Sequence, residues 1–377
     1  YFETEAEATL ICRLELGIAE SIARESQPAL TDILCLACYR PLYQYDWNQD
    51  LKVLDQLPEL KKRVIEEPLG EMVLARDVPV LAGSEHEVSR KVKEQYEQSP
   101  YPRWVKTAIP SKAKSVADFC ADKKLRLSSE TIKSVLSPSI LIAGCGTGQH
   151  SIGTAALFAN CQVTAVDLSR ASLAYAQRKT SELGGTNIRY LQADILNLGA
   201  LNQDFEIIES GGVLHHMHDP MAGWRVLVGC LKNGGLMRIG LYSEIARRPI
   251  TEIREEIARD GIEPTEGKIR RFRQSLIKSR AGQYRQLMDF NDFFSLSEVK
   301  DLAFHVQEHC FSLPQIESCL LELGLQFCGF DSGDIVAKFT KYFGEASDSC
   351  DLSAWHEFEE FHPDTFSGMY TFWCQKL

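Results

Sequence analysis

The chain of 377 residues lacks a long apolar run, a leading secretory signal and an excess of basic residues. A transmembrane helix needs about 20 consecutive apolar residues, and no stretch approaches that length. No positively charged start followed by an apolar segment opens the chain. The formal net charge is −11, whereas broad binding to a phosphate backbone requires a basic surface. We therefore expect neither a membrane nor a nucleic acid as partner.

Paired cysteine motifs are also missing. The twelve cysteines are scattered, and Cys35-x-x-Cys38 stands without the second pair that a zinc ribbon needs. A zinc or redox role for this pair is the alternative, but most other cysteines stand beside apolar residues, as in Phe119-Cys120. The pattern is typical of buried free thiols in a reducing compartment, so we expect a cytoplasmic protein without a bound metal.

What the sequence does contain is a glycine turn between a strand and a helix. Residues 140–143 (Ile-Leu-Ile-Ala) are typical of a buried parallel strand. Glycines then stand at alternate positions, Gly144, Gly146 and Gly148, and helical spacing of apolar residues follows from Ile152. Glycines let the backbone turn sharply and let a ligand approach closely. Together these features predict the first half of a nucleotide-binding βαβ unit.

Further strand-like runs follow, each with polar residues directly after it. They are expected over 161–166, 187–192, 205–209 and 235–242. Asp167 follows the second strand, where an acid can accept hydrogen bonds from a ribose diol, and Asp194 follows the third. Gly211, His215 and His216 follow the fourth. Because ligands bind at the carboxyl edge of open α/β sheets, we expect these groups to meet there.

Over roughly residues 139–242 this arrangement resembles the class I S-adenosylmethionine-dependent methyltransferases: Gly-x-Gly-x-Gly, the acid after strand two, Asp194 and Leu-His-His. A dehydrogenase-like nucleotide fold that binds another ligand is the alternative. The resemblance implies S-adenosyl-L-methionine as cofactor and S-adenosyl-L-homocysteine as product, with the ribose at Asp167 and the adenine amino group at Asp194. It implies these cofactor-binding residues: Gly144, Cys145, Gly146, Thr147, Gly148, Asp167, Leu168, Asp194, Ile195, Gly211, Tyr96 and Arg103.

One position departs from the family's pattern. Many relatives carry an acid just before the first glycine, where it can hold the methionine ammonium, and this chain has Ala143 there. Either another group takes that role or the contact is absent.

The resemblance predicts an α/β fold, with a doubly wound, mostly parallel sheet of seven strands (the Rossmann-like methyltransferase fold). Runs at 325–330 and 369–374 would supply the last two strands, with the seventh antiparallel between the fifth and sixth. Apolar residues at helical spacing predict an all-helical N-terminal region over 1–108. Residues 109–377 would form the methyltransferase domain, interrupted by a helical cap insertion over about 243–312.

This insertion is expected to contain helices over 245–260 and 265–279 and to wall the substrate pocket at the carboxyl edge of the sheet. It carries the most basic stretch of the chain: Arg270, Arg271, Arg273, Lys278, Arg280 and Arg285. A solvated helix face is one interpretation, and a patch that meets an acidic partner is the other.

Residues 94–104 combine Tyr96, two prolines, Arg103 and Trp104. They form either a linker pinned by aromatic packing or a lid over the cofactor with Tyr96 in contact. With Phe304-His-Val-Gln-Glu-His309 and the run from Pro363 to Trp373, this element is similar to a bacterial methyltransferase group whose domain often follows tetratricopeptide repeats.

The loop after strand four lacks two motifs of known methyltransferases. It has neither the Asn/Asp-Pro-Pro-Tyr/Phe of many enzymes that methylate planar amino groups nor the Pro-Cys of pyrimidine carbon methylation. His215 and His216 lie beside the expected methyl position. They are candidates for catalysis, with packing or helix capping as the alternative.

The spacing of His305-Val-Gln-Glu-His309 would place His305, Glu308 and His309 on one face of a helix. A zinc site, a structural polar cluster and a substrate site near His215 are the three interpretations. We favour the substrate site, in which Glu308 pairs with a cationic or hydroxyl-bearing substrate and a histidine takes the proton lost on methylation.

The sequence thus predicts a methyltransferase that acts on a side chain of a protein or peptide, with the helical region as a docking surface. A methyltransferase acting on a small metabolite is one alternative. A non-catalytic scaffold or assembly protein that binds S-adenosylmethionine is the other.

Overall fold

The computed structural model describes residues 3–83, 86–279, 293 and 295–377. Contacts divide the chain into two compact units. The first comprises Tyr1–Asp77 and Ile257–Phe304, and the second comprises Val78–Glu256 and His305–Leu377. The predicted insertion over 243–312 is therefore shared between the units, since its central part belongs with the N-terminal helices.

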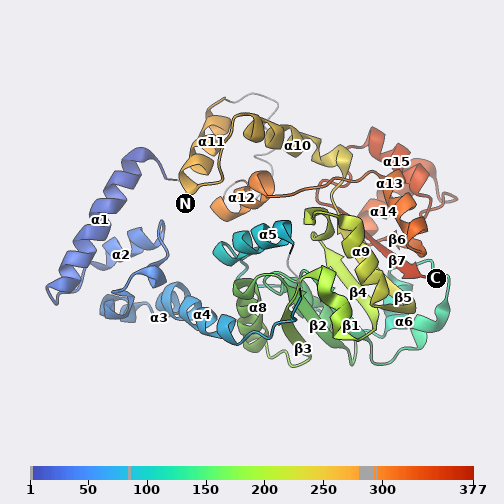
Figure 1. Ribbon diagram of the computed structural model, residues 1–377, viewed down its shortest axis with the longest axis horizontal. Coiled ribbons are helices and arrows are strands. Elements are labelled where there is room, and N and C mark those ends of the chain that lie inside the picture. The colour runs from blue at the N-terminus through green and yellow to red at the C-terminus, as the bar shows by residue number, and fades with distance from the viewer. Residues whose placement is uncertain (1–2, 84–85, 280–292, 294) are drawn as a thin grey trace. The chain divides into compact units, whose positions relative to one another are not determined.

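The second unit contains a seven-stranded sheet in the order β3-β2-β1-β4-β5-β7-β6 (Figure 1). Its strands are β1 (Ser139–Ala143), β2 (Gln162–Asp167), β3 (Ile188–Gln192), β4 (Phe205–Gly211), β5 (Leu231–Leu241), β6 (Leu325–Phe330) and β7 (Tyr370–Lys376). β7 is antiparallel to both β5 and β6, whereas the pairs among the first five strands are parallel. The predicted doubly wound methyltransferase sheet is confirmed, including the place of its last strand.

Both faces of the sheet are buried, which explains why its strands are continuous apolar runs. Leu141 of β1 packs into one core, and its neighbours Ile140 and Ile142 pack into another on the opposite face. The first face is covered by α9 (Pro220–Gly229), α13 (Leu313–Glu322) and α15 (Leu352–Phe361). The second is covered by α6 (Val116–Asp122), α7 (Gln149–Leu157) and α8 (Arg170–Glu182). α5 (Glu87–Gln98) precedes the sheet, and α14 (Gly333–Phe343) follows β6.

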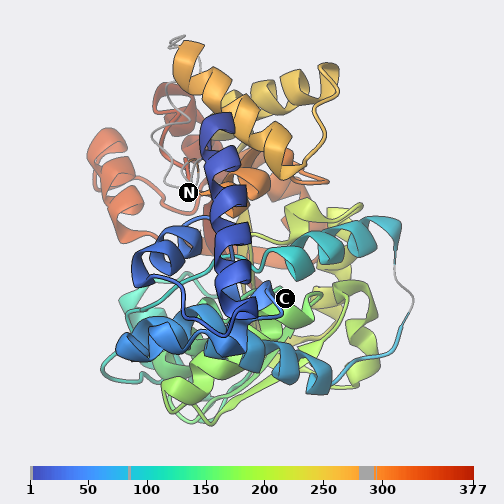
Figure 2. The ribbon, with the colours of Figure 1, turned by 90° about the vertical axis from the view of Figure 1, so that its left-hand side faces the viewer.

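The first unit is helical, as predicted for the N-terminal region (Figure 2). It contains α1 (Glu5–Ala23), α2 (Leu30–Ala37), α3 (Pro58–Lys61), α4 (Glu67–Asp77), α11 (Glu266–Ser279) and α12 (Leu296–Phe304). Ile11 and Ile18 of α1 pack against Ile33 and Leu36 of α2, which confirms the amphipathic pattern of these helices. α10 (Glu244–Arg259) begins in the second unit and ends in the first, and it matches the first helix expected in the insertion, as α11 matches the second. None of the helices in the described ranges combines the length and the hydropathy that crossing a bilayer requires.

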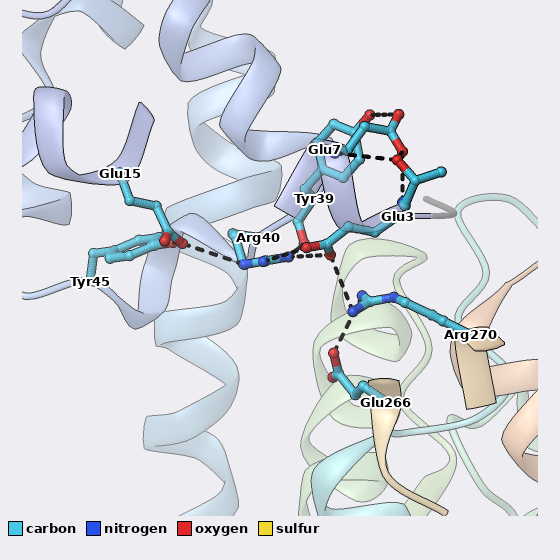
Figure 3. A network of polar contacts seen from close by, with 9 residues as sticks. Glu3, Glu7, Glu15, Tyr39, Arg40, Tyr45, Glu266 and Arg270 are labelled. Carbon is cyan, nitrogen blue, oxygen red and sulfur yellow. Dashed lines mark hydrogen bonds and ion pairs between the residues drawn. The ribbon is translucent and has the colours of Figure 1, made fainter. Parts of the chain in front are cut away.

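A network of charged side chains joins the two sequence segments of the first unit (Figure 3). Arg40 donates two hydrogen bonds to the carboxylate of Glu3 (2.8 and 2.9 Å), and Arg270 of α11 lies 3.1 Å from the same carboxylate. The Glu3 side chain is 5% exposed. The pKa of Glu3 is lowered chiefly by the hydrogen bond from Arg40, although burial acts in the opposite direction. The positive charges of Arg40 and Arg270 lower it further.

The basic stretch of the insertion is therefore not simply a solvated face. Arg270 is engaged with Glu3, and Arg273 is buried, whereas Arg271 is exposed. Arg280 and Arg285 lie outside the described residues.

We expect Glu3→Gln to loosen this unit, because it leaves two arginines without their shared anion. Hydrogen bonds to charged groups contribute about 1.5–3 kcal/mol each, so amides of α1 should exchange with solvent at least tenfold faster at pH 7. Since the folded pKa of Glu3 lies below its ordinary value of 4.5, the stabilisation is complete above that pH and is lost as the pH falls through the folded value. Hydrogen exchange followed by mass spectrometry measures this.

The matched control is Glu20→Gln on the same helix, because the Glu20–Arg24 ion pair is exposed on both sides. Equal exchange in the two variants would contradict the role assigned to Glu3.

Candidate functional site

The glycine turn after β1 adopts a left-handed backbone at all three glycines. The φ angles are 76° at Gly144, 51° at Gly146 and 82° at Gly148. A Cβ at Gly148 would lie 2.5 Å from the Cβ of Ala176, and one at Gly144 would lie 2.3 Å from Val213. Glycine is therefore required both by conformation and by close packing. Cys145 and Thr147, the residues between the glycines, are buried.

Asp167 closes β2 directly beside this turn. Its carboxylate accepts hydrogen bonds from the backbone N–H of Gly146 (2.8 Å) and of Ser169 (2.9 Å). Burial raises the pKa of Asp167, and the hydrogen bonds from Ser169 and Gly146 act against that rise. A carboxylate offers about four acceptor positions, so acceptor capacity remains for a ligand. Leu168 follows and accepts a hydrogen bond from Gln192 on its carbonyl oxygen (2.8 Å).

Asp194 follows β3 and has an acceptor atom to spare. Its Oδ1 accepts a hydrogen bond from the N–H of Leu196 (2.9 Å), but its buried Oδ2 has no hydrogen-bond partner. A buried acceptor without a donor costs free energy, so a ligand donor such as an amino group fits this position. Ile195 beside it is buried and begins a 3₁₀ turn. The residues present thus fit an adenosine-containing cofactor.

Residues 97–104 lie against the glycine turn and the start of α8. Glu97 accepts hydrogen bonds from the N–H groups of Arg170 (2.6 Å) and Ala171 (3.2 Å). Thr147 donates from its hydroxyl to the carbonyl oxygen of Pro102, and Trp104 donates to the carbonyl oxygen of Thr147 (3.3 Å). The segment is thus fixed to the turn by hydrogen bonds, and its function as a lid over the cofactor stays a prediction.

Arg103 and Tyr96, which the sequence predicts to contact the cofactor, have different ring neighbours. Arg103 lies over the ring of Tyr175 on α8, 5.5 Å from its centroid. Tyr96 lies 6.0 Å from the ring of His305. Contact of either residue with the cofactor stays a prediction.

The two histidines after β4 are deeply buried. His215 is 0% exposed and stacks on Tyr242, with 3.8 Å between ring centroids, and neither of its ring nitrogens has a hydrogen-bond partner. His216 stacks on His305 (3.6 Å) and donates from Nδ1 to the carbonyl oxygen of Gln307 (2.7 Å). Next to them, Gly211 ends β4, and the buried hydroxyl of Ser210 has no partner.

The prediction that one helix carries His305, Glu308 and His309 is wrong. α12 ends at Phe304, and the chain from His305 runs without helical hydrogen bonds. Instead it runs beside the ends of β4 and β5: the backbone N–H of Phe311 donates to the carbonyl oxygen of Tyr242 (2.9 Å), and that of His309 donates to the carbonyl oxygen of His215 (2.8 Å). Tertiary hydrogen bonds have overridden the helical spacing, although the residues still converge near His215.

Glu308 does not offer a free carboxylate to a substrate. Arg247 of α10 binds it through Nε (3.1 Å) and Nη2 (3.0 Å), and both side chains are almost fully buried. Arg247 also lies over the ring of Tyr242, at 3.8 Å. The predicted pairing of Glu308 with a cationic substrate would have to break this bidentate ion pair. Within the described residues, no three His, Cys, Asp or Glu side chains are grouped so as to hold a metal ion.

A row of charges beneath the glycine turn was not predicted. Glu209 of β4 is 3% exposed, pairs in register with Ile142 of β1, and contacts Nε2 of His150 (2.5 Å). Arg238 of β5 lies 3.7 Å from Glu209. Burial would raise the pKa of Glu209, but the neighbouring His150 and Arg238 hold it below its ordinary value. One signal in the sequence could have revealed it, namely an acid inside the apolar run 205–210.

This row stands at the topological switch point, since β1 is flanked by β2 on one side and by β4 on the other. Glu209 lies on the strand next to the end of β1, where Ala143 supplies no acid.

Comparison with known proteins supports the fold. A family model described as a methyltransferase domain matches residues 140–235. The uncharacterized protein syc1184_c of Synechococcus sp. is 29% identical over 213 residues, which is 52% of this chain and 49% of that protein. Malonyl-[acyl-carrier protein] O-methyltransferase of Paenibacillus sp. is 30% identical over 129 residues, or 31% of this chain and 47% of that enzyme. The chain spans about half the length of these curated relatives.

Among solved structures, PKMT2 from Rickettsia typhi has the same fold with a TM-score of 0.53. The match covers 71% of this chain and 55% of the PKMT2 chain, at 15% identity. The same protein in complex with AdoHcy gives a TM-score of 0.52. Residues 140–235, which the methyltransferase-domain model matches, include the glycine turn, Asp167, Asp194 and the strand that carries Glu209. The C-terminal part of the chain therefore contains a methyltransferase domain of the class I, S-adenosylmethionine-dependent type.

Proposed function

We propose that this protein transfers the methyl group of S-adenosylmethionine to a side chain of a protein or peptide. The observation that carries the proposal is the unpartnered Oδ2 of Asp194 beside the Asp167-braced glycine turn, within the matched methyltransferase domain. When bound, S-adenosylmethionine supplies a methyl group activated on a sulfonium. The protein's part is to bind it, to exclude water and to hold the acceptor in line.

A polypeptide acceptor is favoured by the first unit. Several large apolar side chains are exposed on its helices: Leu10, Leu16, Met72 and Val73. Exposed apolar side chains on a separate helical unit are better suited to docking a polypeptide than to binding a small metabolite. We also propose that the chain belongs with the bacterial group in which the methyltransferase domain follows tetratricopeptide repeats, which agrees with such an acceptor.

We further propose how the chain holds its cofactor. Asp167 accepts the ribose hydroxyls, Asp194 accepts the adenine amino group, and Glu209 faces the methionine ammonium in place of the acid missing at Ala143. His150 and Arg238, which flank Glu209, would complement the methionine carboxylate. Residues 97–104 cover the glycine turn and limit the access of water.

The proposed activity is tested by incubating the full chain with a cell extract and S-adenosylmethionine labelled in its methyl group. We expect label in the protein fraction. Label confined to small molecules would instead show a metabolite methyltransferase, and a complete lack of transfer would favour a non-catalytic binding protein.

We expect Asp167→Ala to weaken the binding of S-adenosylhomocysteine by at least tenfold. Losing charge-assisted hydrogen bonds costs about 1.5–3 kcal/mol each, and about 1.4 kcal/mol corresponds to a factor of ten. Calorimetry measures the affinity, and Asp204→Ala, just before β4, serves as the control. An unchanged affinity, or tighter binding of a nicotinamide dinucleotide by the unmodified protein, would contradict the assignment.

The role of Glu209 is tested by comparing two ligands. We expect Glu209→Gln to weaken S-adenosylhomocysteine binding about tenfold, because a charged partner of the ammonium is removed. The affinity for 5′-methylthioadenosine, which lacks the amino-acid end, should stay within a factor of two. Glu206→Gln is the matched control, since Glu206 is on the same strand and binds Lys232 and Ser139. Equal losses for both ligands would show that Glu209 only supports the turn.

A further inference from the structure

Beyond the carboxyl ends of β4 and β5 lies a group of buried and half-buried side chains, here termed the histidine cluster. Its members are His215, His216, Tyr242, Arg247, Arg254, His305 and Glu308. All come from the second unit. Two of its members, His215 and His216, follow Gly211 in the loop after β4, where the methyl acceptor is expected.

The charges in this cluster do not cancel. Arg247 and Glu308 form a bidentate pair, which leaves Arg254 as the second cation. Arg254 donates from Nη2 to the carbonyl oxygen of His305 (2.8 Å), while its Nη1 lies 3.9 Å from Glu308 and has no hydrogen-bond partner. Buried guanidinium groups are normally matched by acceptors, so this nitrogen is suited to an anion from outside the chain.

The histidines add no charge and no strong base. Burial lowers the pKa of His215 and His216 well below the ordinary value, with nearby His305 and Arg247 acting in the same direction. Burial also lowers the pKa of His305, to about 4. An efficient general base has a pKa near the working pH, and Glu308 is already neutralised by Arg247. The cluster is thus poorly suited to deprotonating an ammonium or a hydroxyl.

An ammonium acceptor would also be repelled. Arg247 disfavours a positive charge on His215, and Arg254 is the second cation of the cluster. In a buried site of low dielectric, such a field acts strongly on a second cation and favours an anion.

We propose that the methyl acceptor is a carboxylate, bound through one oxygen by Nη1 of Arg254. The proposal rests on the proposed function and names its accepting atom. The free carboxylate oxygen forms the new C–O bond as the bond between sulfur and methyl carbon breaks, and the electron pair of that bond stays on sulfur. The products are a methyl ester and S-adenosylhomocysteine, and no proton is released, so no base is required.

The surroundings suit this reaction for a second reason. A negative oxygen and a positive sulfonium combine to neutral products, so charge disappears along the reaction coordinate. Removal of water from such reactants favours their reaction. Stacked, uncharged rings of His215, Tyr242, His216 and His305 provide that dry environment.

Methyl esters are hydrolysed by mild alkali, whereas methylated amines are not, and this difference tests the proposal. The full chain is incubated with a bacterial cell extract and S-adenosylmethionine carrying a tritiated methyl group. We expect the transferred label to be released by alkali as volatile methanol. Label that resists alkali would overturn the carboxylate proposal and leave the methyltransferase activity standing. Absence of any transferred label would overturn both.

Substitutions on α10 give an independent test. We expect Arg254→Gln to lower the initial rate of alkali-labile labelling at least tenfold while the affinity for S-adenosylhomocysteine stays within twofold. Arg254→Lys should restore part of the rate, because it keeps the charge. Arg248→Gln, exposed on the same helix, is the matched control and should label like the unmodified protein. A normal rate in Arg254→Gln, or an equal loss in Arg248→Gln, would overturn the role of Arg254.

Discussion

The hydrogen bonds between the glycine turn and the end of β2 are the interaction on which the site depends. Three consecutive backbone N–H groups are engaged: Gly144 and Cys145 donate to the carbonyl oxygen of Val166 (2.9 Å each), and Gly146 donates to Asp167. Such an arrangement requires a left-handed backbone, which glycine adopts at low cost. It brings Asp167 to the turn and sets where α7 begins. Residues 97–104 are then placed by Thr147, which binds both Pro102 and Trp104.

Much of the second unit could be predicted from the sequence because local pattern and tertiary role coincide there. A strand buried on both faces must be apolar along its length, so the run 140–143 is recognisable without a partner strand. The glycines are recognisable because a positive φ at three alternate positions strongly favours glycine. Asp167 and Asp194 come directly after strands, so the common direction of those strands brings them to one edge.

The parts that were missed depend on contacts distant in sequence. His305 and His309 have helical spacing, but their segment gains more from hydrogen bonds to the ends of β4 and β5 than from a helix. Glu308 was assigned to a substrate because its partner Arg247, 61 residues away, cannot be inferred from spacing. Glu209 was overlooked because a charge inside a buried strand has meaning only once Arg238 and His150 are seen around it.

The row of charges on the sheet has a consequence for how this protein can change. Glu209 of β4, Arg238 of β5 and Asp331, which follows β6, alternate in sign, with 2.8 Å between Arg238 and Asp331, and Lys123 at the far end. Removing one buried charge leaves its neighbours uncompensated, so substitutions in the row are not independent of one another. Whether a substitution is tolerated at one position then depends on the residues at the other positions of the row. These residues should therefore covary in evolution, although they lie far apart in the sequence.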